Sequence, residues 1–322
     1  MKFEFSAGVV VYSECNGVRR FLILKRNDGK FDFPKGHIEK GEKAQDAAVR
    51  ETYEEAHLKV EIDRYFRRDI RYWFYEGGEK ISKKLSMFLA EVNSEEGVKI
   101  SYEHSGFEWL TAEDAVEKLN SKDRGEIIVS ADRYAESKRQ MDILNLEYSR
   151  LFDRFEHWSL STRFVPGEGP LDARIMFLGQ APGNEEDKKL RPFVGRSGML
   201  LTDMIKKAGL NRDRAYITSV VQFFPPKNRA PSNLEIEVCK PFLFKQIDIV
   251  KPEFVVLLGN IAVLAILGKT GVSSMHGTVV EKDGIKYFIT LHPSAALRIK
   301  SKIPIIEADF KKLGGLLASP HE

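Results

Sequence analysis

The spacing of apolar and polar residues predicts strands and helices in two successive stretches of the chain. In the first stretch, short apolar runs bounded by polar turns predict strands, and helical spacing predicts helices. The expected strands are 7–12, 21–25, 65–75 and 84–92. The expected helices are 43–57, 112–119 and 124–136.

A charged helical segment, "ESKRQMDILNLEYSRLFDRF", separates this stretch from the second one. After it, apolar strands alternate with helices, a pattern typical of a parallel sheet covered by helices on both faces. The expected strands are 173–179, 215–221, 254–259 and 286–291, and the expected helices are 197–208, 233–249 and 260–267. We therefore predict two domains, 1–137 and 138–322.

Length and composition agree with two globular domains. A chain of 322 residues is longer than a typical domain, and 43% apolar residues support a core in each half. The only cysteines, Cys15 and Cys239, exclude a disulfide framework and indicate a reducing compartment. The start "MKFEFSAG" has no apolar signal core, and the apolar run 254–268 is too short for a membrane span. We expect a cytoplasmic protein without membrane contact.

Charge is distributed unevenly between the two halves. Residues 1–137 carry 23 Lys/Arg against 27 Asp/Glu, a balance of −4, whereas residues 138–322 carry 27 against 20, a balance of +7. An acidic half and a basic half indicate two different ligands, and the basic half is the candidate for nucleic acid. The balance by itself also fits ordinary soluble domains.

In the first half, Glu51, Glu54 and Glu55 are spaced i, i+3 and i+4 on a predicted helix, so their carboxylates share one face. Like charges at this spacing repel each other. A hard divalent cation converts the repulsion into binding, because magnesium prefers carboxylate oxygens together with substrate phosphates. Taken alone, the same run also fits a solvated acidic helix face.

These glutamates belong to a longer pattern. Separated by five, seven and two residues, its members are Gly36, Glu42, Arg50-Glu51 and Glu54-Glu55. The pattern resembles the signature of the Nudix hydrolases, whose fold is an α/β/α sandwich with a mixed sheet. The resemblance implies a pyrophosphohydrolase in which the three helical glutamates bind Mg²⁺ or Mn²⁺. His57 stands where the family usually has glycine, which changes the helix end and not the ligands.

Two further segments, "FDFPKGHIEKGE" and "YEHSGFEWL", resemble the branch of this family that cleaves diadenosine polyphosphates. By this resemblance, Glu103 completes the metal site or acts as base, and Glu54 and Glu103 are the catalytic carboxylates. A metal cluster held in this way neutralises a polyphosphate and activates water for attack on phosphorus.

Basic and aromatic residues near this site have two interpretations each. Lys83 and Lys84 either bind phosphate or are solvated on a strand. Tyr72, Trp73 and Tyr75 either stack on a base or pack against the protein. The substrate stays open between a dinucleoside polyphosphate, a damaged nucleoside triphosphate and another nucleoside diphosphate derivative.

In the second half, loops at the carboxyl ends of predicted strands carry the candidate chemistry. "GQAPG" (179–183) follows the first strand, "FFPPKNRAP" (223–231) follows the second and "LHPSAALR" (291–298) follows the last. Ligands of open α/β sheets bind at this edge. We therefore expect the three loops to form one site.

Together with "RPFVGRSGMLL" and "KPEFVVLLG", these loops resemble the family-4 uracil-DNA glycosylases over 140–322. The resemblance implies a three-layer α/β/α domain with a parallel four-stranded sheet. It implies hydrolysis of the N-glycosidic bond of a base flipped out of DNA. In that reaction Phe193 stacks on the base, Gln180 and Ala181 contact it, and His292 stabilises the leaving base.

The same resemblance implies DNA as the partner of this domain. Lys227 and Arg229 are expected at phosphates, which give affinity without sequence choice. Leu297 and Arg298 belong to the loop that enters the duplex.

Family members carry four cysteines around an iron–sulfur cluster, and this chain does not. Phe155, Trp158 and Phe223 stand at three of the cysteine positions, and only Cys239 remains. One thiolate does not hold a four-iron cluster, so we predict a domain without one. We expect the three aromatic residues to fill that volume as a hydrophobic plug, unless the alignment is shifted and they are unrelated core residues.

Two further departures concern catalysis and base choice. Gln180 stands where the family has glutamate and is followed by Ala181, so no carboxylate there orients water, and Glu186 is the candidate for that role. Ser219 replaces an asparagine that reads the edge of uracil, and Gly183 leaves room where many uracil-specific enzymes have tyrosine. A serine hydroxyl donates or accepts. We therefore expect relaxed base choice with uracil as the main substrate.

The sequence thus predicts a bifunctional DNA-repair protein. Its N-terminal domain is a metal-dependent nucleoside polyphosphate pyrophosphohydrolase, and its C-terminal domain is a glycosylase for uracil or another deaminated or mismatched base in DNA. The alternative is an active Nudix hydrolase joined to a nucleic-acid-binding domain without catalytic activity.

Overall fold

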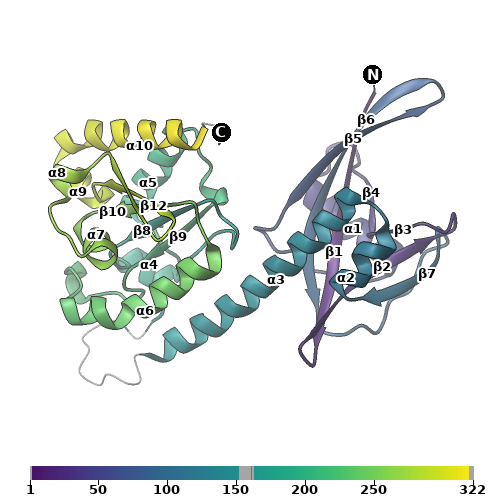
Figure 1. Cartoon of the computed structure of the whole chain (residues 1–322), viewed down its shortest axis with the longest axis horizontal. Helices are drawn as coiled ribbons and strands as arrows, with labels where there is room; N and C mark the ends of the chain where they lie inside the picture. Colours follow the sequence, from purple (N-terminus) through teal and green to yellow (C-terminus); the bar gives the residue numbers. More distant parts are fainter. Residues whose placement is uncertain (1, 152–160, 162, 319–322) are drawn as a thin grey trace. The chain divides into compact units, whose positions relative to one another are not determined.

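The computed structural model describes residues 2–151, 161 and 163–318. The chain divides into two compact units, Met1–Glu136 and Ser137–Glu322 (Figure 1). None of the described helices is long and apolar enough to cross a membrane.

The described residues of the first unit contain a seven-stranded mixed sheet in the order β3-β2-β1-β6-β5, with β4 paired to β1 and β7 paired to β2. Its strands are β1 (Lys2–Cys15), β2 (Val18–Arg26), β3 (Phe31–Asp32), β4 (Lys35–His37), β5 (Arg68–Glu76), β6 (Glu79–Val92) and β7 (His104–Leu110). β1 and β6 are parallel, and the other pairs are antiparallel. The predicted mixed sheet is confirmed, although the pattern missed the short strands β3 and β4 and the half-exposed β7.

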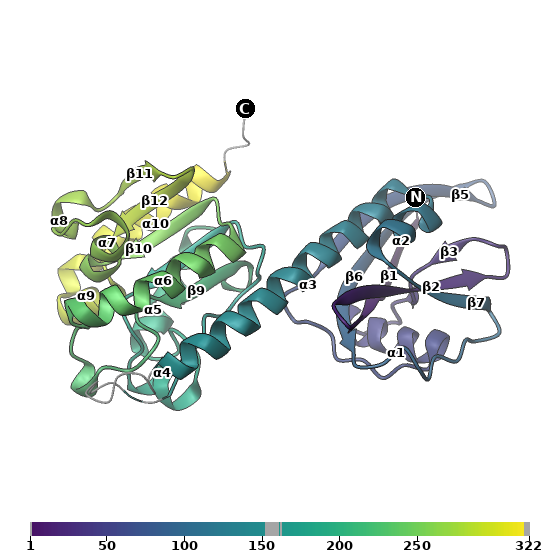
Figure 2. The ribbon, with the colours of Figure 1, turned by 60° about the horizontal axis from the view of Figure 1, so that its bottom comes forward.

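Three helices begin in the first unit: α1 (Ala44–Ala56), α2 (Ala112–Leu119) and α3 (Lys122–Ser149), which continues into the second unit. Figure 2 shows α1 and the first part of α3 on opposite sides of the sheet. Ala47 and Ala48 of α1 pack against Val9 and Val11 of β1, and all four are fully buried. Small residues bring α1 close to the sheet, which fixes the direction of its polar face.

The second unit contains, among the described residues, a five-stranded sheet in the order β11-β12-β10-β8-β9. Its strands are β8 (Ile175–Gly179), β9 (Ala215–Ser219), β10 (Phe254–Leu258), β11 (Thr278–Lys282) and β12 (Ile285–Thr290). The four strands β12, β10, β8 and β9 are parallel, as predicted. β11 is an additional antiparallel edge strand. Its mostly exposed residues form no apolar run, so the pattern did not predict it.

Helices cover both faces of this sheet, as expected for a three-layer domain. They are α4 (Asn184–Lys189), α5 (Arg196–Lys207), α6 (Asn233–Val250), α7 (Asn260–Leu267), α8 (Val272–Met275), α9 (Pro293–Arg298) and α10 (Ile303–Ala318). Figure 1 shows α5 and α10 on one side of the sheet and α6 and α7 on the other. Every residue of β8 and β10 is buried. The loops after β8, β9 and β12 leave the same edge of the sheet, where the second candidate site lies.

Candidate functional sites

The first candidate site is a pocket of about 720 Å³ beside α1. Glu51, Glu54 and Glu55 line it from α1, and Glu103 lines it from the segment before β7. We call it the carboxylate pocket after these four residues. The structure thus brings together the carboxylates that the sequence analysis selected for metal binding and catalysis.

Arg50 and Gly36 position the carboxylates. The Arg50 guanidinium donates to Glu42 at 3.0 Å through two nitrogens, and its Nη1 donates to Glu51 at 2.9 Å and to Glu54 at 3.0 Å. A Cβ at Gly36 would overlap the Glu51 carboxylate. The glycine and the arginine of the signature therefore shape the pocket around its acidic residues.

Glu55 is an enclosed carboxylate of this pocket, with a side chain that is 12% exposed. It accepts a hydrogen bond from the Lys35 backbone N–H at 2.9 Å. Burial raises the pKa of Glu55 to about 7, and the charges of Glu51 and Glu103 add to the effect. Burial also raises the pKa of Glu51. A raised pKa means that the ionised carboxylate is disfavoured, and a cation in the pocket would offset this cost.

This donor set fits a hard divalent cation, which prefers several carboxylate oxygens and water. Within the described residues, no three acidic, histidine or cysteine side chains are gathered in a metal-binding arrangement. Arg50 engages Glu51 and Glu54 instead. A cation has to compete with Arg50 for these two carboxylates. The absence of a side chain at Gly36 leaves room for the Glu51 carboxylate.

His57 ends α1 in the left-handed conformation, with φ of 59°. Its N–H donates to the Tyr53 carbonyl at 2.9 Å, and the two rings stack with centroids 4.6 Å apart. Glycine adopts this conformation without strain, which explains the glycine usual at this place in the signature. His57 does not line the carboxylate pocket, so the replacement leaves the acidic residues in position.

The β5–β6 pair distributes the basic and aromatic candidates over two faces. Tyr72 is the cross-strand partner of Lys83, and Lys83 lines the carboxylate pocket. Lys84 follows on the opposite face, which it shares with Trp73 and Tyr75. These two aromatic side chains are 60% and 65% exposed. Of this group, Lys83 and Tyr72 therefore lie on the side of the carboxylate pocket.

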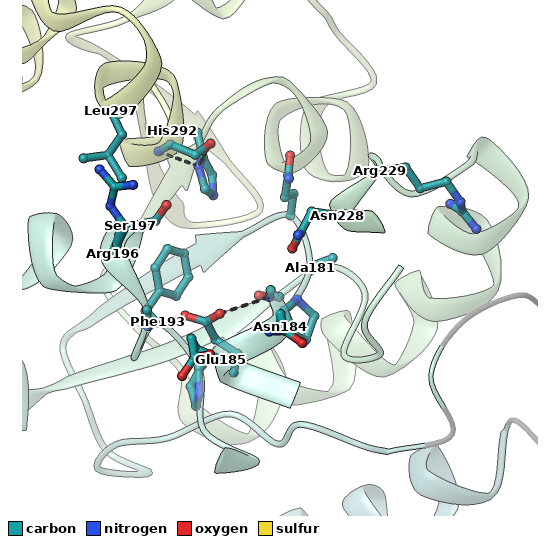
Figure 3. Close-up of a pocket in the computed structure, with 18 of the residues that line it drawn as sticks. Ala181, Asn184, Glu185, Phe193, Arg196, Ser197, Asn228, Arg229, His292 and Leu297 are labelled. Carbon is teal, nitrogen blue, oxygen red and sulfur yellow. Dashed lines mark hydrogen bonds between the residues drawn. The ribbon is translucent and has the colours of Figure 1, made fainter. Parts of the chain in front are cut away.

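The second candidate site is a pocket of about 530 Å³ at the carboxyl ends of β8, β9 and β12. We call it the loop pocket, and its lining comes from 180–186, 192–193, 195–197, 219, 228–229, 292, 294 and 297–298. Figure 3 shows Phe193, Asn228 and His292 around it from three separate segments. The three loops that were expected to form one site do meet there.

Phe193 forms part of the wall of the loop pocket. Its φ is positive at 51°, and a Cβ at Gly198 would overlap its carbonyl group. A Cβ at Gly179 would press into its ring. The centroids of the Phe193 and His292 rings are 5.9 Å apart. Two glycines thus allow the strained backbone and the ring position that place Phe193 beside His292.

His292 caps the N-terminus of α9, and its Nδ1 accepts a hydrogen bond from the Ser294 backbone N–H at 3.1 Å. A nitrogen that accepts from an N–H carries no proton, so the neutral ring carries its proton on Nε2. Burial lowers the pKa of His292 to about 4, and the charge of Arg298 adds to the effect. At neutral pH, His292 is therefore an uncharged Nε2–H donor.

Gln180, Ala181 and Ser219 line the same pocket. The N–H groups of the two residues after Ser219 donate to the carbonyls of Gly179 and Gln180, at 3.0 and 3.1 Å. The end of β9 is therefore tied to the turn after β8. Ser219, which is 6% exposed, consequently has a fixed position relative to Gln180.

A buried ring of three hydrogen bonds lies behind the end of β9 and connects it to α6. Gln222 donates to the Thr218 hydroxyl at 2.6 Å, Thr218 donates to Gln246 at 3.0 Å, and Gln246 donates back to Gln222 at 2.8 Å. All three side chains are at most 1% exposed. Because buried polar groups are stable only when paired, the ring holds α6 against the end of β9 that carries Ser219.

Glu186 binds the backbone of two loops. Its Oε1 accepts from the N–H groups of Val194 and Gly195 at 2.9 and 2.7 Å, and its Oε2 accepts from the N–H of Gly183 at 3.1 Å. A Cβ at Gly183 would lie 2.7 Å from Oε2. The glycine that was expected to leave room for a base therefore also leaves room for this carboxylate.

Three of the predicted DNA-contacting residues lie at or near the rim of the loop pocket. Leu297 and Arg298 line it from the end of α9. Lys227 is exposed in the turn Pro226–Asn228 and is outside the lining. Lys227 precedes Asn228, which does line the pocket.

Arg229 has a different environment from the one expected. Its guanidinium donates twice to Glu235, at 2.8 and 2.6 Å, and Figure 3 shows it pointing away from the pocket. Asn228, which the sequence analysis did not select, points into the pocket, and Arg196 and Ser197 also line it. Its neighbours Lys227 and Arg229 were the residues expected to contact DNA. The sequence carries no signal for the direction of the Asn228 side chain.

Phe223, at one of the cysteine positions, is fully buried among aromatic rings. Its centroid lies 5.6 Å from that of Tyr148 and 5.7 Å from that of Phe164. Phe155 and Trp158, the other two residues of the predicted plug, lie outside the described residues. Phe223 accordingly packs as a core residue with partners that the sequence analysis did not identify.

The residues present do not fit an iron–sulfur cluster. Cys239 is fully buried, and burial raises the pKa of its thiol to about 12. A cluster needs thiolates. The only other cysteine of the chain, Cys15, belongs to the first unit.

Comparison with known proteins finds relatives for both units. Residues 2–130 match the NUDIX domain, and residues 166–313 match the Uracil DNA glycosylase superfamily. The chain is 45% identical over 174 residues to a type-4 uracil-DNA glycosylase of Sulfurisphaera tokodaii, a match that covers 51% of this chain and 79% of that protein.

Two further relatives follow the same division. A type-4 uracil-DNA glycosylase of Thermotoga maritima is 44% identical over 143 residues, covering 44% of this chain and 74% of that protein. A bis(5′-nucleosyl)-tetraphosphatase (asymmetrical) of Caenorhabditis elegans is 32% identical over 125 residues, covering 38% of this chain and 90% of that protein. Both family resemblances read from the sequence are confirmed.

Proposed function

Because the chain belongs to the Nudix family in its first unit and to the uracil-DNA glycosylase superfamily in its second, both of them hydrolase families, we propose that it is a bifunctional hydrolase. The first domain, 1–137, hydrolyses a nucleoside polyphosphate with Mg²⁺ or Mn²⁺. The second, 138–322, excises uracil or another deaminated or mismatched base from DNA. The carboxylate pocket carries the first assignment, and the pairing of Phe193 with an uncharged His292 carries the second.

In the first domain, Glu51, Glu54 and Glu55 would hold the divalent cation, with Glu103 as a further ligand or as base. When bound, the cation neutralises polyphosphate charge and lowers the pKa of the water that attacks phosphorus. Lys83 lines the same pocket and can bind a phosphate oxygen. The Caenorhabditis elegans relative is named for a bis(5′-nucleosyl) tetraphosphate, which supports dinucleoside polyphosphates as one candidate substrate class.

The test of the first activity uses a panel of nucleoside polyphosphates with Mg²⁺ and Mn²⁺. We expect Glu51→Gln and Glu55→Gln each to reduce turnover by about two orders of magnitude or more, as loss of a ligand or base does. Glu61→Gln, an exposed glutamate outside the pocket, is the control and should retain wild-type turnover. Near-normal turnover in both pocket variants on every substrate of the wild type contradicts the assignment.

In the second domain, the bond between C1′ and the base breaks, and its electron pair moves into the base, so negative charge develops on the base oxygens. Water then adds to C1′ and releases a proton, and the departed base anion takes up a proton from solvent. His292 offers its Nε2–H to O2 of the leaving base, and an uncharged donor in a buried site stabilises such charge without a proton transfer. Phe193 stacks on the base, and Gln180 contacts it near O2.

The geometry revises two of the predicted roles. Both oxygens of Glu186 already accept backbone N–H groups, so we assign Glu186 to positioning the loops and not to orienting water. Arg229 is engaged by Glu235, so we assign it to the structure of its loop and not to a phosphate. Lys227, Leu297 and Arg298 remain the DNA-contacting residues of this proposal.

Base choice tests the second activity. A serine hydroxyl at position 219 discriminates less than an amide with two matched hydrogen bonds, which is worth roughly 1–3 kcal/mol, or about tenfold or more. The test compares excision of uracil, thymine and hypoxanthine opposite guanine by the wild type and by Ser219→Asn. The asparagine variant should be about tenfold more selective for uracil. Unchanged relative rates remove Ser219 from recognition, and no excision by either protein favours a nucleic-acid-binding domain without activity.

A further inference from the structure

One face of the first unit carries exposed aromatic rings that neither proposed activity uses. Phe3, Phe5, Trp73 and Tyr75 are 63%, 52%, 60% and 65% exposed. They come from the first residues of β1 and from β5, on either side of β6. Figure 1 shows the tip of the β5–β6 hairpin projecting from the unit. A cluster of this kind on a soluble domain marks an interaction site.

The strand register places these rings on one face. Phe3 is paired with Ser82 of β6, and Ser82 is paired with Trp73 of β5. Directly paired residues point to the same face, so two rings flank a small side chain. Neighbouring strands lie about 4.8 Å apart, so the two rings arise roughly 10 Å apart. Planar bases stack at a spacing of about 3.4 Å, and the gap above Ser82 is therefore wide enough for a base to stack on either ring.

Basic side chains lie among the rings. Lys80 places its Nζ 4.4 Å from the Trp73 ring centroid, and Arg71 is exposed on the same face. Asp69, an acidic residue of this face, is balanced by two cations, Arg67 at 2.9 Å and Lys84 at 3.1 Å. Arg71 and Lys80 consequently give the face a positive excess within a half of the chain that is acidic overall.

We propose that this face binds single-stranded nucleic acid. The aromatic–basic face consists of Phe3, Phe5, Arg71, Trp73, Tyr75 and Lys80. Aromatic rings that stack on bases and cations that contact phosphates are the two elements of such sites. A duplex keeps its bases stacked on each other and offers none to the rings. A second copy of the chain, related by a twofold axis, would bring the same positive charges together. A single strand complements both the rings and the charge.

The test measures binding of a fluorescent thymidine 20-mer to the full-length protein by anisotropy, in EDTA so that no metal links its phosphates to the carboxylate pocket. The double variant Trp73→Ala/Tyr75→Ala should bind at least about tenfold more weakly, since each stacked base contributes about fivefold or more. Trp73→Phe keeps a ring and should bind within about twofold of the wild type. Phe107→Ala removes a 39% exposed ring of β7 and is the matched control.

Two further measurements test the positive charges of this face and self-association. Arg71→Glu/Lys80→Glu should flatten the dependence of log affinity on log salt by about 1 to 1.5, the contribution of two phosphate contacts. Polyphosphate hydrolysis should be unchanged in all these variants, which shows that the domain is folded. Equal affinity in the wild type and the double alanine variant refutes the proposal. If sedimentation shows a dimer that dissociates in Trp73→Ala while oligonucleotide affinity is unaltered, the face mediates self-association and not nucleic-acid binding.

Discussion

Because the pKa of Glu55 is raised, we predict that Glu55→Gln stabilises the metal-free protein although it lowers hydrolytic activity. Folding moves this pKa from its ordinary value of 4.5 to about 7. Between these values the folded state binds a proton that the unfolded state releases, so the stability of the metal-free protein falls as pH rises from about 4.5 to 7 and is level above that. The pKa difference corresponds to about 3 kcal/mol, at about 1.4 kcal/mol per pH unit.

Glu55→Gln removes the buried charge and keeps a carbonyl oxygen for the Lys35 N–H. In EDTA at pH 8, this variant should therefore be more stable than the wild type by up to about 3 kcal/mol. Both proteins are compared at the same pH, so their intrinsic exchange rates are equal. The gain in stability should therefore slow hydrogen exchange on peptides that cover α1 by up to roughly 100-fold. Glu54→Gln is the control, since the Glu54 side chain is 55% exposed and an exposed ion pair contributes about 0–1 kcal/mol.

Magnesium should reverse the order of the two proteins. A cation that binds the folded state stabilises it, so saturating Mg²⁺ should slow exchange in α1 of the wild type and change Glu55→Gln little. Faster exchange in Glu55→Gln than in the wild type at pH 8 in EDTA refutes the reasoning. The same conclusion follows if the wild type, after correction for intrinsic exchange, is as stable at pH 8 as at pH 5.

Three further outcomes are expected. Gly36→Ala should abolish polyphosphate hydrolysis and the response of α1 to Mg²⁺, because the added Cβ overlaps the Glu51 carboxylate. Gly106→Ala should not, because its Cβ meets only the Lys25 Cβ, at an ordinary contact distance of 4.0 Å. The single-turnover rate of base excision should be constant from pH 8 to about 5 and change only near the His292 pKa of about 4. His292→Ala should lower this rate by about 100-fold or more. A change of rate near pH 6.5 contradicts an uncharged His292. Protein purified without oxygen should contain no stoichiometric iron or sulfide, and four irons per chain contradict the loss of the cluster.

The carboxylate pocket was predictable because much of it is local. Spacing of i, i+3 and i+4 places Glu51, Glu54 and Glu55 on one helix face in any fold that keeps the helix. Glu103 joins them from a distant segment, and only the family resemblance identified it. The raised pKa of Glu55 was not predictable, because it comes from burial in the folded pocket, which outweighs the opposite effect of the Lys35 N–H and charge.

Charged residues of the loop pocket were harder to interpret from sequence. The family resemblance assigned Glu186 to catalysis and Arg229 to phosphate binding. In the structure, Glu186 is satisfied by backbone N–H groups and Arg229 by Glu235. A charge that the fold already pairs has to give up its partner before it can bind a ligand, and the pairing is set by tertiary contacts that spacing does not encode. The uncharged Asn228 faces the pocket instead.

The aromatic run of β5 is divided between the two faces of its sheet. The period of two along a strand separates Tyr72 from Trp73 and Tyr75, so the three rings lie on two faces of the sheet. Which face holds the carboxylate pocket follows only from register, because Lys83 is the partner of Tyr72. Full burial of a ring stabilises a fold by about 1.5–3 kcal/mol, and Trp73 and Tyr75 leave most of this unrealised. That unused free energy is available for stacking on bases, which is the physical basis for a nucleic-acid partner at this face.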